Sequence, residues 1–404
     1  MDRVVVVGAS AGGLATAEAL RRFGFTGDIT VIGSEAYLPY DRPPLSKQVL
    51  TGEWEPNQVL LRSSAQLDEL GLRLRLGETA TGVDPRRRLV TVAGERIRYD
   101  ELVVATGVRP RRLPGADEVR GVHFLRTLED ALALKESLRA GRRLIVVGAG
   151  FIGAEAAAAA RGLGVEVTML EPEPVPLARV LGAEIGAELS EVHRERGVDL
   201  RTGVVATEVL SLRGQVTGVG LADGSVVPGD VVVIGIGSQP NVEWLRDSGL
   251  PVGDGLICDE FSAAAPGVHG VGDVARWHNP LFGVDMRVEH RTNAAEQGLA
   301  VARALTVPSA RKPFAPVPYF WSDQYDLKIQ AYGHLRDHDE VAVVDGTLTG
   351  RRFVAAYRRD GLLTGVVAVN TSPKVVRSWR ASVAAHRPWS DIGTEQRAAT
   401  GAGQ

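Results

Sequence analysis

Two short runs of apolar residues, at positions 4–7 and 144–147, stand out in the hydrophobic pattern. Their β-branched and leucine side chains predict strands that are buried on both faces. Each run passes through a glycine-rich turn into an alanine-rich stretch that predicts a helix, and a second apolar strand follows. This order is that of a βαβ unit. The pattern therefore predicts two α/β units of similar architecture, with helices at 13–23 and 153–163 and second strands at 28–32 and 166–170.

The rest of the pattern divides into strands, one further helix and a distinct C-terminal part. Residues 72–104 alternate apolar and polar positions, which predicts short strands. In both halves a strand then runs into a small turn, at 105–107 and at 235–237. A helix is expected around 128–139. Beyond Pro313 the pattern becomes α+β, and the last dozen residues are expected to be loosely held, with strands near 327–332, 340–344, 352–358 and 362–369 and a helix at 373–385.

Composition argues against nucleic-acid-binding and membrane-spanning proteins but does not indicate a particular enzyme activity. The chain has 404 residues, of which 44% are hydrophobic and 24% charged, and its formal net charge is −3. This balance suggests two or three globular domains and gives no sign of nucleic-acid binding. No apolar run reaches the roughly 20 residues of a membrane span, and no signal-peptide pattern precedes the first strand. We therefore expect a cytoplasmic protein with no membrane partner.

The single cysteine, Cys258, limits the redox chemistry of the chain itself. One cysteine cannot form an internal disulfide or a redox-active pair, and it cannot hold an iron–sulfur cluster. The eight histidines are scattered, and none has metal-ligand spacing with the cysteine. We expect no metal site.

The first glycine turn has the spacing of a dinucleotide fingerprint, with Gly8, Ser10 and Gly13 at the three small-residue positions. Glycines there permit a tight turn and let the backbone approach a pyrophosphate at the helix N-terminus. Ser10 replaces the middle glycine. Glu35 lies 22 residues after Gly13, where a carboxylate can accept from a ribose hydroxyl. The alternative is a strand, turn and helix that bind nothing.

The second fingerprint is complete, with Gly148, Gly150 and Gly153. Glu171 lies 18 residues beyond Gly153, where a carboxylate favours a free 2′-hydroxyl and repels a 2′-phosphate. This favours NADH over NADPH, although Glu171 could also be an ordinary acid at a strand end. Two dinucleotide sites in one chain predict electron transfer between a flavin and a nicotinamide.

Four further motifs carry a resemblance to a known family: residues 40–47 (YDRPPLSK), 105–110 (ATGVRP), 272–273 (GD) and 318–325 (PYFWSDQY). Together they resemble the FAD-dependent NADH:ferredoxin reductases of bacterial oxygenase systems, over roughly residues 3–390. The resemblance implies a glutathione-reductase-like α/β fold with two Rossmann-type dinucleotide-binding domains and a C-terminal α+β domain. The implied boundaries are an FAD-binding domain at 1–112 and 241–315, an NAD-binding domain at 113–240 and an interface domain at 316–404.

The resemblance also implies roles for individual residues. Lys47 would lie near the reactive ring of the flavin, and Glu155 would pair with Lys47 where nicotinamide enters. A fixed cation there would stabilise negative charge that develops on hydride arrival. The alternatives are a solvated loop lysine and an acid on a helix surface. The remaining cofactor-binding residues would be Arg42, Ala105, Thr106, Gly107, Arg109, Gly272, Asp273 and Trp321 for FAD, and Gly237 for NAD.

Two of these assignments have ordinary alternatives. Asp273 would accept from the ribityl chain of FAD, but Gly-Asp is also a common turn dipeptide. Trp321 would stack near the flavin, but plain core packing explains a tryptophan equally well. The sequence also departs from the family, since Arg291 stands where a tryptophan is usual. We expect Arg291 to change the local flavin contacts and the surface that a partner meets.

Charge gives a weak indication of the partner. From Arg311 to the C-terminus there are 13 Lys and Arg against 9 Asp and Glu. A basic face could steer a small acidic protein toward the molecule, and an ordinary solvated surface is the alternative. Its candidate members are Arg351, Arg352, Arg358, Arg359, Lys374, Arg377 and Arg380.

The resemblance implies an enzyme that takes hydride from NADH and passes electrons through FAD to an iron–sulfur ferredoxin. That ferredoxin would serve a cytochrome P-450 type monooxygenase or a ring-hydroxylating dioxygenase. Two alternative functions are compatible with the same fold. One is an NADH oxidase or quinone reductase with a small acceptor, and the other is a redox-switched binding protein like apoptosis-inducing factor.

Overall fold

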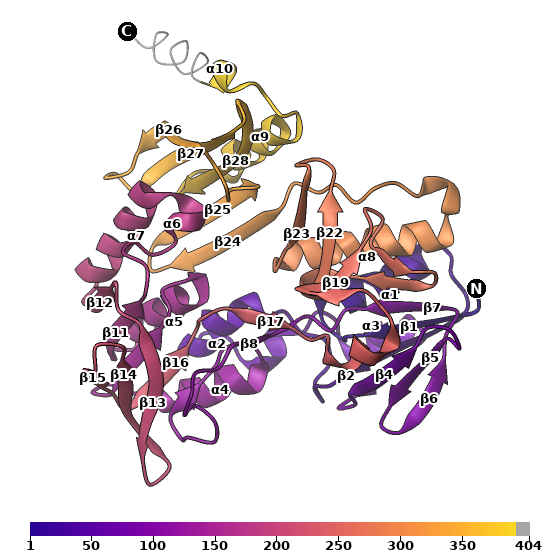
Figure 1. Ribbon diagram of the computed structural model, residues 1–404, viewed down its shortest axis with the longest axis horizontal. Helices are drawn as coiled ribbons and strands as arrows, with labels where there is room; N and C mark the ends of the chain where they lie inside the picture. The colour runs from indigo at the N-terminus through magenta and orange to yellow at the C-terminus, as the bar shows by residue number, and fades with distance from the viewer. Residues whose placement is uncertain (393–404) are drawn as a thin grey trace. The chain divides into compact units, whose positions relative to one another are not determined.

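The computed structural model describes residues 1–392, so the expectation of a loosely held end at 393–404 lies outside the described residues. The chain forms two compact units, which are described separately here (Figure 1). Unit 1 comprises Met1–Arg42, Asn57–Arg109 and Gln239–Pro318. Unit 2 comprises Pro43–Pro56, Pro110–Ser238 and the C-terminal part from Tyr319.

The central sheet of unit 1 has six strands, and all but the β20 edge run parallel. Its middle strand, β1, is buried because four consecutive valines cover both faces, and Val6 lies between Val31 and Val103 of its neighbours. The strand order is β20 (Ala263–Ala265), β21 (Val268–Gly270), β7 (Glu101–Val104), β1 (Arg3–Val7), β2 (Asp28–Gly33) and β3 (Leu72–Leu76).

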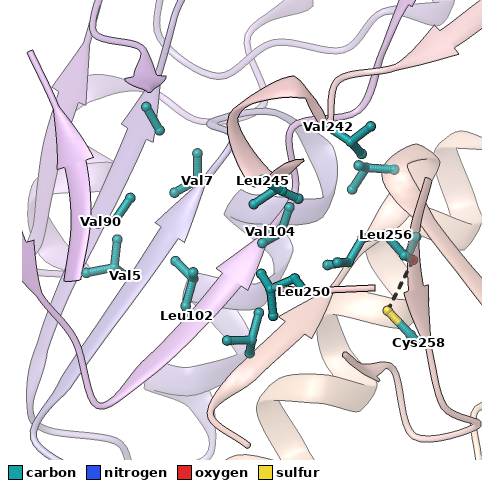
Figure 2. Packing of buried hydrophobic residues seen from close by; sticks show 14 of the residues in the cluster. Val5, Val7, Val90, Leu102, Val104, Val242, Leu245, Leu250, Leu256 and Cys258 are labelled. Carbon is teal, nitrogen blue, oxygen red and sulfur yellow. Dashed lines mark hydrogen bonds between the residues drawn. The ribbon is translucent and has the colours of Figure 1, made fainter. Parts of the chain in front are cut away.

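Alternate residues of this sheet face different layers. Val4 and Val6 pack against helices α1 (Ala11–Arg22) and α8 (Arg291–Thr306), which lie side by side (Figure 1). Val5 and Val7 face the opposite cluster, which contains Leu245, Leu250 and Leu256 (Figure 2). Two smaller sheets complete that side, formed by β4 (Ala80–Asp84), β5 (Leu89–Val92) and β6 (Glu95–Arg98), and by β18 (Val252–Gly253), β19 (Gly255–Cys258), β22 (Ala275–Asn279) and β23 (Val284–Arg287).

Short elements complete unit 1 and its borders. They are α3 (Ser64–Glu69), the 3₁₀ turns η2 (Pro56–Val59), η3 (Glu243–Ser248), η4 (Gly272–Val274) and η5 (Pro308–Ala310), and the paired strands β8 (Val108–Pro110) and β17 (Ser238–Pro240).

Unit 2 repeats the parallel architecture with a five-stranded sheet. Helix α5 begins directly after the glycine turn, and its alanines pack on the sheet together with Leu134 of α4. The elements are β12 (Val198–Thr202), β11 (Glu166–Glu171), β10 (Arg143–Val147), β16 (Val231–Ile234) and β9 (Val122–His123) in sheet order, helices α4 (Leu128–Ser137) and α5 (Phe151–Gly162), and a small sheet of β13 (Ala206–Leu212), β14 (Gln215–Leu221) and β15 (Val226–Pro228).

The C-terminal antiparallel sheet also belongs to unit 2. One face packs on α7 (Ala183–Glu195) through residues such as Ile329 and Phe353, while α9 (Pro373–Ala384) contacts the sheet through β25 and β28. The sequence pattern missed β24 but located the other four strands and α9. In sheet order, the strands are β24 (Tyr319–Gln324), β25 (Leu327–Gly333), β28 (Leu362–Val369), β27 (Arg352–Arg359) and β26 (Glu340–Thr347). The short helix α6 (Ala178–Leu181) precedes α7, and α10 (Trp389–Ile392) follows α9.

The short proline-rich segment 43–56 lies in unit 2, although residues on both sides of it lie in unit 1. It contains η1 (Pro43–Ser46) and α2 (Gln48–Thr51). Leu50 of α2 is fully buried in the core that α4, α5 and the five-stranded sheet form. A buried leucine therefore fixes the position of Lys47, three residues earlier in the chain.

The mixed α/β architecture expected from the sequence is confirmed, and small differences concern where helices begin. Helices α1 and α5 begin at Ala11 and Phe151, two residues before the predicted starts at Gly13 and Gly153. Both glycines lie in the first turn of their helices, where the lack of a side chain lets the carbonyl oxygen of the preceding glycine turn, at Gly8 or Gly148, come close to the helix. No helix among residues 1–392 is long and apolar enough to cross a membrane.

The glycine in the first turn of α5 can be tested against one at its end. A Cβ on Gly153 would lie 2.1 Å from the carbonyl oxygen of Gly148, whereas a Cβ on Gly162 would meet nothing within 4 Å. We predict that Gly153→Ala lowers stability by about 1–3 kcal/mol because backbone must move. Gly162→Ala should be neutral or stabilise by up to about 1 kcal/mol. Urea unfolding of the two variants checks this, and equal stability would contradict it.

Candidate dinucleotide and redox site

The first glycine turn brings two strand ends and a helix together in unit 1. Gly8 has φ +124°, and a Cβ there would lie 2.0 Å from the carbonyl oxygen of Ala105 at the end of β7. A Cβ on Gly13 would lie 1.8 Å from the oxygen of Gly8. Ser10 occupies the N-cap of α1 with no side-chain capping bond. The two glycines are therefore needed for backbone packing, and Ser10 leaves the helix N-terminus uncapped by its own hydroxyl.

Glu35, Arg42 and Asp273, which lie far apart in the sequence, are electrostatic neighbours. Arg42 Nη2 lies 2.6 Å from Glu35 Oε1, and Tyr40 donates its hydroxyl hydrogen to Glu35. Burial alone would lower the pKa of Arg42, but Tyr40, Glu35 and Asp273 outweigh it, so the pKa is raised. The predicted FAD residues thus form one charged group, although Glu35 already holds two protein donors.

The segment around Asp273 is built by backbone contacts to α8. Gly272, with φ +74°, donates its N–H to Gln297 Oε1 at 2.8 Å. In the first turn of α8, Asn293 is only 1% exposed, and neither atom of its side-chain amide has a partner among the described residues. An unsatisfied buried amide is costly, and a bound polar ligand would supply the missing partners. This part of unit 1 therefore fits a polar cofactor.

Arg291 forms a contact that the sequence did not foresee. Its Nε donates to Asp41 Oδ1, so the residue that replaces the usual tryptophan ties the start of α8 to the 40–47 motif. Both side chains are about a quarter to a third exposed. The expected changes in flavin contacts and in the partner surface stay predictions.

Two predicted FAD residues after β7 use their side chains within the protein. Thr106 donates its hydroxyl to the carbonyl oxygen of Asn241 at 2.8 Å, and Arg109 pairs with Glu243 at 2.7 Å. Gly107 accepts from the N–H of Asn241. These contacts join the two sequence segments of unit 1, and any contact with cofactor stays a prediction.

The second turn, in unit 2, repeats the close approach of the first. Gly148 has φ +98°, and a Cβ on it would lie 2.5 Å from the oxygen of Gly235 at the end of β16. Gly237 accepts from the N–H of Arg111. Gly150, at the N-cap of α5, differs because a Cβ there would meet nothing within 4 Å. Its lack of a side chain leaves an open cradle at the helix N-terminus, which fits a dinucleotide phosphate.

Glu171 ends β11 beside this turn. Its Oε2 accepts from the N–H of Ala149 at 2.8 Å, and its Oε1 accepts from the N–H of Glu173 at 3.1 Å. A carboxylate has about four acceptor sites, so one oxygen can still accept from a ribose hydroxyl. The ribose contact stays a prediction, and the structure adds a role in holding the turn.

Lys47 and Glu155 form a nearly buried ion pair within unit 2. Lys47 Nζ lies 2.7 Å from Glu155 Oε2, and the two side chains are 12% and 3% exposed. This confirms the expected pairing, and it excludes the alternatives of a solvated lysine and a helix-surface acid. Ser46 donates to Glu155 Oε2 at 2.5 Å, Ser322 donates to Oε1 at 2.6 Å, and sequence reasoning missed both hydroxyls.

Trp321 lies on β24, the strand that the pattern missed. Its ring stacks on Tyr319 with centroids 5.9 Å apart and an interplanar angle of 23°. The ring is only partly buried. Stacking near the flavin remains a prediction.

Cys258 lies in the core of unit 1, where its Sγ points to the carbonyl oxygen of Leu256 at 3.4 Å (Figure 2). Burial raises the pKa of its thiol to about 12. It is therefore not a reactive thiolate. Among residues 1–392, no group of three or more His, Cys, Asp or Glu side chains could hold a metal ion.

Three members of the candidate basic face, Arg351, Arg358 and Arg359, form ion pairs with acids of unit 2. Arg351 pairs with Glu188 and Glu195 at 3.0 and 2.7 Å. Arg358 pairs with Asp339 and Glu340 at 2.8 and 2.7 Å. Two of these acids, Glu188 and Glu195, come from α7, far away in the sequence, and the basic face stays a prediction.

Comparison with known proteins agrees with this geometry. The family model for pyridine nucleotide-disulphide oxidoreductases matches residues 2–298, and a reductase C-terminal model matches residues 319–392. The chain belongs to the pyridine nucleotide-disulphide oxidoreductase family. Since it has one cysteine, it is a member without a disulphide centre.

Individual relatives cover nearly the whole chain. A ferredoxin–NAD(P)(+) reductase of Sphingomonas sp. is 37% identical over 93% of this chain and 92% of that protein. The ferredoxin–NAD(+) reductase component of the p-cumate 2,3-dioxygenase system of Pseudomonas putida is 36% identical over 94% and 93%. The solved covalent complex of putidaredoxin reductase with putidaredoxin matches with a TM-score of 0.93 at 33% identity, over 98% of both chains. The resemblance drawn from the sequence is confirmed.

The buried ion pair generates a stability prediction. Glu155→Gln removes the negative charge opposite Lys47, which then has only neutral acceptors: the amide oxygen of the new side chain and the carbonyl oxygen of Pro43, 3.2 Å away. We predict a loss of about 3 kcal/mol in the free energy of unfolding, since an uncompensated charge is left nearly buried. Urea unfolding measures it, with the exposed Glu166→Gln as the control. The double variant Lys47→Met/Glu155→Leu should recover most of the loss, and no recovery would contradict the charge argument.

Proposed function

We propose that the protein is an FAD-containing, NADH-dependent reductase that passes electrons to an iron–sulfur ferredoxin. The observation that carries this proposal is the presence of two glycine turns with matching close backbone approaches, one in each unit, together with the buried Lys47–Glu155 pair. The family membership makes the chain a flavoprotein oxidoreductase that uses FAD and a nicotinamide dinucleotide. The ferredoxin would in turn serve a cytochrome P-450 type monooxygenase or a ring-hydroxylating dioxygenase.

The proposed roles follow the two units. In unit 1, the turn with Gly8, Ser10 and Gly13 binds the FAD pyrophosphate. The other FAD residues position the cofactor; they are Glu35, Arg42, Ala105, Thr106, Gly107, Arg109, Gly272 and Asp273. Bound FAD supplies the chemistry, since it accepts two electrons as hydride and releases them singly. The buried amide of Asn293 supports a polar ligand at this place.

In unit 2, Gly148, Gly150, Gly153 and Gly237 would bind the nicotinamide dinucleotide, and Glu171 would select NADH. Because its carboxylate is fixed to the turn by Ala149, it presents a constant negative charge that a 2′-phosphate would meet. Lys47 and Glu155 would act on the reacting rings, with Lys47 as the fixed cation and Glu155 as its partner. Trp321 would shape the same place.

The proposed domain boundaries at 112/113, 240/241 and 315/316 fall within three residues of points where the chain passes between the two units. This supports the division into an FAD-binding part, an NAD-binding part and a C-terminal interface domain. The interface domain shares its core with α7 of the NAD-binding part.

Relatives support the ferredoxin partner and the downstream oxygenase. One relative is named as a component of a dioxygenase system, and a solved relative is bound to putidaredoxin. We further propose a cytoplasmic location, because a lone buried cysteine suits a reducing compartment. A small-acceptor enzyme and a redox-switched binding protein remain the two rivals, and one assay separates them.

That assay is NADH-driven reduction of cytochrome c by the purified protein, with and without an acidic iron–sulfur ferredoxin. We predict a rate that depends on ferredoxin and is at least about tenfold lower with NADPH, because like-charge repulsion at Glu171 costs more than 1.4 kcal/mol. Rapid flavin bleaching by NADH without ferredoxin dependence would favour the small-acceptor enzyme. Slow bleaching would favour the binding protein.

A further inference from the structure

Glu155 is one end of a buried series of hydrogen bonds that extends well beyond Lys47. Ser322 Oγ donates to Glu155 Oε1 at 2.6 Å, and Gln324 Nε2 donates to Ser322 Oγ at 3.2 Å. His193 Nε2 lies 3.1 Å from Gln324 Oε1, and His193 Nδ1 lies 3.1 Å from the hydroxyl of Tyr325. These five residues, all in unit 2, are called the Glu155 network below.

The hydrogen atoms in the Glu155 network all point the same way. Burial lowers the pKa of His193 to about 4, so the ring is neutral near pH 7 and carries one N–H. Gln324 Oε1 can only accept, so that hydrogen is on His193 Nε2, and Nδ1 accepts from Tyr325. Every donor is therefore directed toward the Glu155 carboxylate, an arrangement in which successive bonds polarise and strengthen one another.

The far end of the network is held in a strained conformation. Tyr325 has φ +55°, a region that a bulky side chain rarely occupies, in the turn between β24 and β25. Its ring lies edge-on to His193 with centroids 5.3 Å apart, and the guanidinium of Arg196 lies 5.3 Å from the ring centroid. Such strain persists only where surrounding contacts fix it, so α7 and the β24–β25 turn are locked together at His193.

The network determines which carboxylate oxygen faces Lys47. Ser322 occupies Oε1, which leaves Oε2 for Ser46 and Lys47. Ser322, in turn, has its lone pairs oriented by the amide of Gln324. If Gln324 or His193 were lost, Ser322 could turn, and Glu155 could rotate away from Lys47.

We propose that His193 and Gln324 are positioning residues that act through Ser322 to hold the Glu155 carboxylate against Lys47. This inference rests on the proposed function, in which Lys47 and Glu155 act where NADH delivers hydride. In the structure, the side-chain polar partners of His193 and Gln324 are Tyr325, Ser322 and each other, so their expected effect on the reaction passes through Ser322 and Glu155.

A matched control residue lies on the same helix. Ser190 is buried one turn before His193 on α7 and lines the same small cavity as His193 and Gln324. Its hydroxyl donates to the carbonyl oxygen of Gly186 within its own helix and takes no part in the Glu155 network. Ser190→Ala therefore perturbs the same packing without touching the series of hydrogen bonds.

The test uses the FAD-loaded holoprotein and stopped-flow reduction by saturating NADH. We expect Gln324→Met and His193→Phe each to slow flavin reduction by about threefold to tenfold, the effect of one or two lost hydrogen bonds. Ser190→Ala should leave the rate unchanged. The flavin midpoint potential should rise in Gln324→Met and in His193→Phe, in the same direction as in Glu155→Gln, because Lys47 would lose part of its compensating negative charge.

The decisive arm repeats both substitutions in the Glu155→Gln background. If they act only through Glu155, they should cause no further slowing there. The inference would be overturned if either substitution slowed flavin reduction further in the Glu155→Gln background. It would also be overturned if Ser190→Ala slowed flavin reduction as much as they do. Wild-type rates and midpoint potentials in both Gln324→Met and His193→Phe would overturn it as well. Should Gln324→Met fail to fold, His193→Phe carries the same test. Failure of wild-type protein to be reduced by NADH would instead refute the proposed function.

Discussion

The burial of one carboxylate, that of Glu155, accounts for much of the architecture of unit 2. A charge that is 3% exposed must be paired and hydrogen-bonded, or it would destabilise the fold by several kcal/mol. Its partners come from η1 and its neighbour Lys47 and from β24, which lie more than 100 residues away from α5 in opposite directions along the chain. Satisfying this carboxylate therefore requires the 43–56 segment and the C-terminal sheet to pack with the second βαβ unit, and both do.

The same requirement explains why the division of the chain is not the one that motif order suggests. The segment 43–56 is surrounded in sequence by unit 1, yet Leu50 and Lys47 commit it to unit 2. The C-terminal sheet shares a core with α7, so this sheet and the second βαβ unit belong to one compact unit. If the proposed function holds, the residues that handle the nicotinamide and the fixed cation are held by one packed core.

The sequence predicted those features that depend on local chemistry. Both fingerprints lie where their glycine spacing placed them, because the close backbone approaches at Gly8 and Gly153 involve residues near in the chain or at neighbouring strand ends. The strand β24 was missed because its residues do not alternate cleanly, with only Ser322 and Gln324 buried. The roles of Ser46, Ser322 and His193 could not be assigned from sequence, because each side chain hydrogen-bonds a residue that lies 100 or more positions away.

The two glycine turns make matching close backbone approaches but differ at their N-cap residues, and that difference gives the most direct test. Ser10 carries a side chain at the N-cap of α1, whereas Gly150 at the N-cap of α5 has open space where a Cβ would be. Gly150 has φ −70°, which any residue can adopt, so the protein itself does not require glycine there. The requirement is expected to come from the nicotinamide dinucleotide.

The first measurement should therefore be the bound FAD content and the NADH-dependent flavin bleaching of Gly150→Val beside the wild type. We predict a folded protein with the wild-type amount of FAD and a severe loss of bleaching, because a branched side chain would occupy the proposed phosphate cradle of unit 2 alone. Loss of FAD from this variant, or bleaching at the wild-type rate and NADH dependence, would contradict the assignment of two different dinucleotides to the two turns.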